Sequence, residues 1–338
     1  MILKAWLDGL RRVRNAPAVL AGTFVLMLAS AAPLALTLRG IIEAHLDRSL
    51  AAESAAEAVN YDWWQEFSSQ ASGIGTTFTP AVIGFASTLD ALSGVLDARL
   101  PTAPIAGALG TYLLAWTFLS GGILDRYARQ HRTRAHGFFA ACGVFFWRFL
   151  RLGIVAGAAY WMLFTYIHRW LLDDAYQKII VDVSAERVAS FWRAGLYALF
   201  GALLVGVNIT IDYAKIRLVV EDRRSAIGAL SAALGFLGRH AGAACGLYAL
   251  NGLVFVGLLV LWALAAPGAG GVGLSMWTAF AVTQLYLLAR IGLKLQFMAS
   301  ETAFFQRSLA HSEFTAAPLP VWPDSPAAAS IAMTSDVR

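Results

Sequence analysis

The chain has 338 residues, of which 58% are hydrophobic and only 14% are charged, and its mean hydropathy is +0.62. A soluble domain usually carries about 25% charged residues, so this composition excludes an ordinary soluble protein. The formal net charge of +5 does not indicate a nucleic-acid partner, because the basic residues cluster beside long apolar segments rather than on a soluble face.

Six apolar segments are long enough to cross a bilayer, which takes about 20 residues of α-helix. The last two come from one charge-free run that is too long for a single span and that Pro267–Gly273 interrupts, since Pro and Gly break helices. We therefore predict an all-α polytopic membrane protein whose transmembrane domain occupies residues 1–305. Its six transmembrane helices are expected at residues 16–38, 100–124, 150–171, 192–212, 241–265 and 274–296.

The basic residues predict the orientation of these spans. They gather at residues 4–14, 126–134 and 215–224, beside alternate span ends, and such clusters stay in the cytoplasm. This places both termini in the cytoplasm, and the Arg-rich, Ala-rich composition indicates a bacterial inner membrane. Ala29-Ser30-Ala31 resembles a signal-peptide cleavage site after residues 1–31. The apolar run continues to Leu38, however, which favours a retained span.

Three segments of the chain resemble one another. Each begins with a basic amphipathic stretch and enters a span through two small residues four positions apart, which allows close helix packing. We predict three hairpins, each preceded by a basic interfacial helix that binds anionic lipid head groups at the inner leaflet. The alternative is that these stretches are the cytoplasmic ends of long tilted spans. The small-residue pairs are Ala18 and Gly22, Gly153 and Gly157, and Gly242 and Gly246.

Residues 40–102 form the largest outer segment, which is predicted to be periplasmic, acidic and amphipathic. A helix is expected from Thr79 onward, because apolar residues recur every three or four positions there. The aromatic run that includes Tyr61, Trp63, Trp64 and Phe67 is interpreted as an outer interface at the membrane surface. A sugar-stacking site or a protein-binding hot spot is the alternative interpretation.

Charged residues near the inner span ends form the candidate polar site. We expect Asp212 to pair with Arg290 or Lys294, because charges near the bilayer tend to be paired. The pair could line a polar vestibule or only anchor the helices at the interface. From residue 306 to 338 the chain is rich in Ala, Pro and Ser, which predicts a disordered cytoplasmic tail.

The sequence carries no catalytic, nucleotide-binding or metal-binding motif, so no cofactor, metal or catalytic residue is predicted. The first functional hypothesis is a non-enzymatic scaffold or accessory subunit of a membrane complex. Its partner would bind the periplasmic segment or the C-terminal tail, and nucleic acid is not expected. The alternative is a transporter or permease component, because repeated hairpins are common in transporters. An enzyme acting on lipid or glycan is the third hypothesis.

Overall fold

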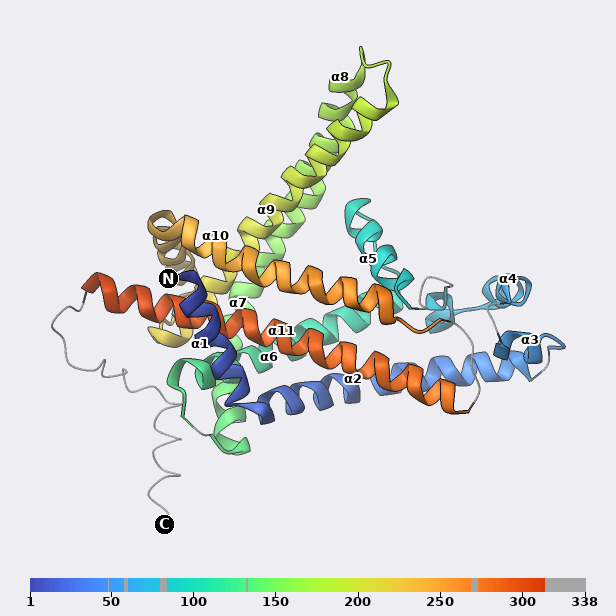
Figure 1. The fold of residues 1–338 in the computed structure, drawn as a ribbon, viewed down its shortest axis with the longest axis horizontal. Helices are drawn as coiled ribbons and strands as arrows, with labels where there is room; N and C mark the ends of the chain where they lie inside the picture. Colours follow the sequence, from blue (N-terminus) through green and yellow to red (C-terminus); the bar gives the residue numbers. More distant parts are fainter. Residues whose placement is uncertain (48, 58–59, 80–83, 132, 269–272, 314–338) are drawn as a thin grey trace. The chain divides into compact units, whose positions relative to one another are not determined.

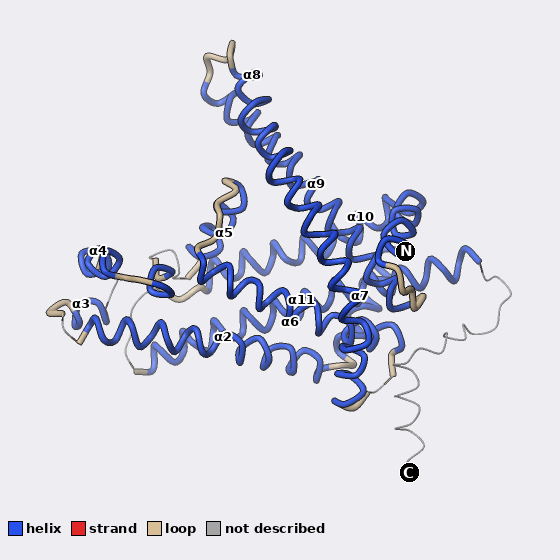
Figure 2. Tube along the Cα trace, turned by 180° about the vertical axis from the view of Figure 1, so that it is seen from behind, coloured by secondary structure: helices blue, strands red, loops and turns tan. Residues whose placement is uncertain are grey.

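The structure is a computed structural model that describes residues 1–47, 49–57, 60–79, 84–131, 133–268 and 273–313. Within these ranges every regular element is a helix and no residue is in a strand (Figures 1 and 2). The elements are α1 (Ile2–Arg14), α2 (Pro17–Leu46), α3 (Ala52–Glu57), α4 (Tyr61–Gln70), the 3₁₀ turn η1 (Gly73–Thr77), α5 (Ala86–Leu96), α6 (Ala103–Arg129), α7 (Ala135–Met162), the π-helical turns η3 (Leu163–His168) and η4 (Trp170–Ala175), α8 (Tyr176–Ile180), α9 (Glu186–Val220), α10 (Ala226–Ala265) and α11 (Leu274–Glu313).

In the described part of the chain, six helical segments are long and apolar enough to cross a bilayer, so the chain is a multi-pass membrane protein. Four of the six predicted spans lie entirely inside these helices, and the other two begin at residues 16 and 100, just before Pro17 and Ala103. Each helix extends past its predicted span at one end or at both. The first, for example, runs from Pro17 to Leu46, where the sequence predicted an end at Leu38. The third is one continuous helical stretch from Ala135 to Ile180, in which α7 passes into the π-helical turns without a break.

The three basic lead-in stretches differ in structure. The first is the separate helix α1, which ends at Arg14 before Pro17 opens α2, a position that proline favours. The second is part of α7 and has no break from its span. The third lies in α10, whose backbone leaves helical geometry at His240, with φ −127° and ψ 21°. The sequence repeat therefore corresponds to three different local structures.

The C-terminal boundary also differs from the prediction. The sequence placed the start of a disordered tail at residue 306, whereas α11 continues to Glu313. Phe304, Phe305 and Ser308 are buried, so this end of α11 belongs to the packed core. Residues 314–338 lie outside the described residues, and the tail there stays a prediction.

The chain forms two packing units. Unit 1 comprises the described residues of 1–16, 116–251 and 295–313, and it holds the main hydrophobic core. In this unit α7 and α9 pack side by side, as both views of the backbone show (Figures 1 and 2). The largest fully buried side chains of the unit include Tyr127, Tyr213, Phe145 and Phe304.

Unit 2 comprises residues 17–115 and 252–294. Its α10 and α11 segments meet where the rings of Trp262 and Tyr286 stack, with ring centroids 4.2 Å apart. The predicted helix from Thr79 is seen as α5, which begins at Ala86. Residues 80–83 lie outside the described part of the chain.

Candidate functional site

Helix α1 is fixed to unit 1 by one buried face. Ala5, Gly9 and Arg12, which share that face, are its buried residues. A Cβ atom at Gly9 would lie 2.7 Å from the Cα and N atoms of Ser300 in α11. Only glycine permits this approach, so the two helix backbones are in direct contact.

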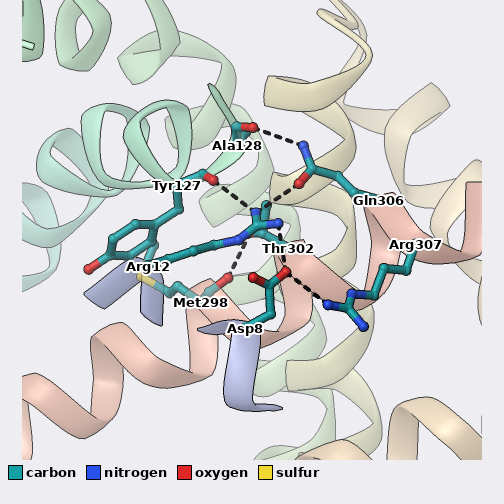
Figure 3. Close-up of polar contacts among 8 residues, drawn as sticks. All are labelled: Asp8, Arg12, Tyr127, Ala128, Met298, Thr302, Gln306 and Arg307. Carbon is teal, nitrogen blue, oxygen red and sulfur yellow. Dashed lines mark hydrogen bonds and ion pairs between the residues drawn. The ribbon is translucent and has the colours of Figure 1, made fainter. Parts of the chain in front are cut away.

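The buried end of this face carries a polar cluster, which we call the Arg12 cluster (Figure 3). Arg12 donates hydrogen bonds from Nη1 to the Tyr127 carbonyl oxygen at 2.8 Å and to Gln306 Oε1 at 2.7 Å. Its Nη2 atom lies 3.2 Å from Asp8 Oδ2, and Arg307 also contacts Asp8, at 3.5 Å. Gln306 in turn donates to the Ala128 carbonyl oxygen at 3.0 Å. The cluster therefore joins α1, α6 and α11.

The electrostatics of this cluster favour a structural role. The Arg12 side chain is almost fully buried, and this burial lowers its pKa, while the nearby Asp8 carboxylate acts in the opposite direction. An arginine remains charged in proteins, so the positive charge needs the acceptors that surround it. One of these acceptors is the Tyr127 carbonyl oxygen, and Gln306 binds the Ala128 carbonyl oxygen. Both oxygens belong to the last turn of α6, where carbonyl groups lack partners within their own helix. Arg12 and Gln306 cap that helix end.

A second set of hydrogen bonds ties α1 to α10 and α11. Trp6 donates from Nε1 to Asn251 Oδ1 at 3.0 Å, and Asn251 donates from Nδ2 to Ser300 Oγ at 2.9 Å. Gln296 donates from Nε2 to the Trp6 carbonyl oxygen at 2.9 Å. Asn251 is fully buried, and its side chain joins α10 to α1 and to α11.

A third polar group, which we call the Asp212 cluster, lies between α7, α9 and α10. Lys215 donates from Nζ to Asp212 Oδ1 at 2.9 Å, and Asn208 donates from Nδ2 to Asp212 Oδ2 at 3.0 Å. Asn208 also bonds the hydroxyls of Tyr248 at 3.1 Å and Tyr160 at 3.5 Å. Asp212 is thus held by a cation and an amide of its own helix.

Glu301 of α11 lies close enough to this cluster for the charges of Asp212 and Lys215 to act on it. Its side chain is 2% exposed, and its Oε1 atom has no hydrogen-bond partner among the described residues. Sequence reasoning missed this residue because it fell just beyond the predicted sixth span. The sequence did contain an indication of it: Glu301 is the one carboxylate between Ala299 and Ala303, and the residues around it are small or apolar.

The predicted pairing of Asp212 with Arg290 or Lys294 stays a prediction. Asp212 belongs to unit 1, whereas Arg290 and Lys294 belong to unit 2. In the described contacts Asp212 pairs with Lys215, and Lys294 donates to the Tyr112 hydroxyl at 2.8 Å.

The predicted small-residue positions have few neighbours within the described residues. Ala18 is exposed, and a Cβ atom added at Gly22, Gly153, Gly157 or Gly242 would meet no atom within 4 Å. Gly246 differs, because an added Cβ there would lie 2.7 Å from Ile2 Cδ1 of α1. Close backbone packing instead occurs at glycines outside the predicted set, namely Gly9, Gly121 and Gly122.

The predicted outer aromatic set divides into buried and exposed members. Trp63 and Phe67 of α4 are 7% and 2% exposed, and they pack against His45 and Phe78 in unit 2. Trp63 Nε1 also hydrogen-bonds His45 Nδ1 at 3.0 Å. Two of the four predicted interface residues therefore lie in a small local core.

The two remaining aromatic residues are less enclosed. Trp64 donates from Nε1 to the Phe78 carbonyl oxygen at 3.0 Å and is half-buried. Tyr61 is 55% exposed, so it is the member of the set most available to a membrane surface or a partner.

Among the residues that the structure describes, no group of three or more His, Cys, Asp or Glu side chains could hold a metal ion. Comparison of the chain with protein-family models, with curated proteins and with solved structures finds no match. Functional inference therefore depends on the geometry of the chain itself.

Proposed function

We propose that this chain is a non-enzymatic scaffold or accessory subunit of a membrane complex in a bacterial inner membrane, with both termini in the cytoplasm. The observation that carries the proposal is the exposure of α2, a 30-residue apolar helix. Only 6% of its most apolar stretch is buried, against 39% in α6. A helix that packs so little within its own chain has most of its surface available to another membrane protein.

Photo-crosslinking tests this role. A benzophenone amino acid is placed at Leu28 or Leu36, which are 44% and 65% exposed. The matched control is Leu20, whose side chain faces Gly292 within unit 2. We expect Leu28 and Leu36 to cross-link to one other polypeptide of constant mass, identified by mass spectrometry, and Leu20 to give no such product. Cross-links to lipid alone, or only to a second copy of this chain, would contradict the proposal.

The proposed arrangement has three hairpins, each led by a basic interfacial helix at the inner leaflet. The basic clusters support this orientation, and α1 supports the interfacial helix. The exposed surface of α1 carries apolar and basic side chains together. Apolar residues can enter the lipid and basic residues can bind anionic head groups. These exposed residues are Leu3, Leu7 and Leu10, with Lys4 and Arg11.

Cysteine labelling in intact cells tests the topology. In a Cys245→Ser background, which removes the exposed native thiol, Ser87→Cys in α5 should react with a membrane-impermeant maleimide. His131→Cys, which follows α6, should react only after the membrane is permeabilised. The reverse pattern would invert the proposed orientation.

A transporter or permease component is the second candidate. It is favoured by the buried carboxylate of Glu301 near Asp212, because an ionisable residue within a membrane protein often marks an ion or proton path. Proteoliposomes loaded with a pH-sensitive dye test it. Proton flux should exceed that of empty vesicles and fall in Glu301→Gln, and equal flux in all three preparations would exclude proton-coupled movement.

A further inference from the structure

The Asp212 cluster and Glu301 together contain an unbalanced charge. Asp212 and Glu301 each carry one negative charge when ionised, and Lys215 carries one positive charge. Lys215 already bonds Asp212 at 2.9 Å, so these three side chains sum to one net negative charge. Burial of an uncompensated carboxylate is strongly unfavourable, and a protein usually neutralises such a group.

Glu301 is the carboxylate of this group that has no positive partner among the residues that the structure describes. It is 2% exposed, and its neighbours on α11, Phe304 and Phe305, are completely buried. Its Oε1 atom accepts no hydrogen bond from any described residue. The hydroxyl of Tyr213, whose ring packs on Phe304 with centroids 6.3 Å apart, is also buried without a partner in the described part of the chain. The Glu301 carboxylate oxygen therefore has no donor among the described residues, whereas a protonated carboxyl in this apolar region would carry no charge.

The groups around Glu301 come from α9 and α10. The electrostatic neighbours of the Glu301 region are Asp212, Tyr213 and Lys215 from α9 and Tyr248 from α10. Arg217 of α9 stacks over Phe305, 5.1 Å from the ring centroid, and pairs with Glu221. His240 of α10 stacks on Phe236. The charged groups that α1 brings to α11 belong to the Arg12 cluster, where they contact Gln306 and Asp8.

We propose that Glu301 is a proton-binding site, in which one proton neutralises the pair of carboxylates formed by Glu301 and Asp212 while Lys215 stays with Asp212. This inference goes beyond the scaffold role and holds whether or not the chain transports anything. The bound proton makes the packing of α11 against α9 and α10 dependent on pH, because its loss leaves a buried negative charge between these helices.

Thermal unfolding of the purified full chain in mild detergent tests the proposal. The wild type is compared with Glu301→Gln, which mimics the protonated side chain, and with Glu186→Gln, which removes an exposed carboxylate of α9. A folded state that holds a proton which the unfolded chain releases loses stability as the pH rises. We expect the wild-type midpoint to fall relative to Glu301→Gln by about 2 °C per pH unit between pH 6 and 9. Glu186→Gln should follow the wild type.

A second variant and a spectroscopic measurement keep the proposal falsifiable if Glu301→Gln does not fold. Asp212→Asn removes one negative charge, so Lys215 then balances Glu301 and the pH dependence should weaken. The infrared spectrum of the wild type at pH 8 should contain the carbonyl stretch of a protonated carboxylic acid, and Asp212→Asn should lose intensity there.

Three results would overturn the proposal. The first is a difference in unfolding midpoint between the wild type and Glu301→Gln that stays constant from pH 6 to 9. If Glu301→Gln does not fold, the same constant difference between the wild type and Asp212→Asn would count. The second is a wild-type spectrum without the carboxylic-acid band. The third is a midpoint that depends on sodium when choline replaces it at equal ionic strength, because that would assign a metal ion to the site in place of the proton.

Discussion

Arg12 and Gln306 bind each other at 2.7 Å, and each also binds a carbonyl oxygen in the last turn of α6. These two side chains, 294 positions apart in the sequence, therefore complete the end of a helix that belongs to neither of them. The N-terminal helix and the end of α11 are coupled through this contact (Figure 3).

Substitution of Arg12 should destabilise unit 1. In Arg12→Met the Tyr127 carbonyl oxygen and Gln306 lose a charged donor, while Asp8 keeps its contact with Arg307. Because buried acceptors without donors are costly, we expect a loss of about 2 to 3 kcal/mol in the free energy of unfolding. Chemical denaturation in mild detergent measures it. Arg11→Met, at an exposed neighbouring position, should change stability by less than about 0.5 kcal/mol, and equal losses in the two variants would refute the capping role.

The contribution of Arg12 should not depend on pH between 6 and 9. Burial lowers the pKa of Arg12, so its neutralisation would restore stability only as the pH rises through the folded-state value. An arginine does not reach that point in this range, and the guanidinium therefore stays charged throughout. The stability difference between wild type and Arg12→Met, measured at pH 6, 7.5 and 9, should be constant. A difference that changes steadily with pH would show that another titrating group acts through Arg12.

The Gly9 contact should not tolerate a methyl group. In Gly9→Ala the new Cβ would lie 2.7 Å from backbone atoms of Ser300, and backbone cannot move aside as a flexible side chain can. We expect a loss of about 1 to 3 kcal/mol from overpacking. Gly153→Ala is the matched control, since its Cβ would enter open space and should stabilise α7 by about 0.5 to 1 kcal/mol. Denaturation midpoints that fall equally in both variants would contradict this distinction.

Asn251 should hold α1 in place. Asn251→Ala removes the hydrogen bonds to Trp6 and Ser300, so we expect faster amide hydrogen exchange throughout α1 and a loss of about 1 to 2 kcal/mol. Ser300→Ala breaks only one of these bonds and should have a smaller effect on α1. Unchanged exchange in α1 of the Asn251 variant would mean that the Gly9 and Arg12 contacts suffice.

The aromatic core around α4 should be a local unit of stability. Phe67→Ala removes a side chain that is 2% exposed, and the expected loss is about 3 kcal/mol. Tyr61→Ala, at an exposed position on the same helix, should have little effect. Hydrogen exchange should increase in α4 and η1 of the Phe67 variant and remain unchanged in α1, and protection of α4 equal to wild type would refute the local core.

The sequence could predict the spans because each depends on a local property. A helix that crosses lipid must be apolar for about 20 consecutive residues. The residues of one segment alone show whether it meets this requirement, whatever segment packs against it. Four of the six predicted spans lie within the long apolar helices of the described chain, and the other two begin at residues 16 and 100, just before α2 and α6. The break near Pro267 falls between α10 and α11. Helix ends were predicted less well, because residues polar enough for an interface also continue the helices, before the span in α7 and after it in α11.

The polar contacts could not be predicted, since they join residues far apart in the chain. Arg12 looked like one of several basic residues of an amphipathic helix, and only the packing of α1 on α11 distinguishes it from the exposed Arg11 and Arg14. The spacing of small residues marked six candidate packing positions, Ala18 and five glycines, yet the glycine that touches another backbone most closely is Gly9, which is outside that set. Spacing shows which residues share a helix face but not which helix lies opposite it.

The sequence by itself determined that this is an all-helical, multi-pass membrane protein, because hydrophobicity and helix formation are properties of consecutive residues. The tertiary structure alone decided that Arg12 caps α6, that Asn251 holds α1, and that Glu301 is a buried carboxylate near Asp212. The physical reason is that burial and charge compensation are set by neighbours in space, which the order of residues along one helix does not specify.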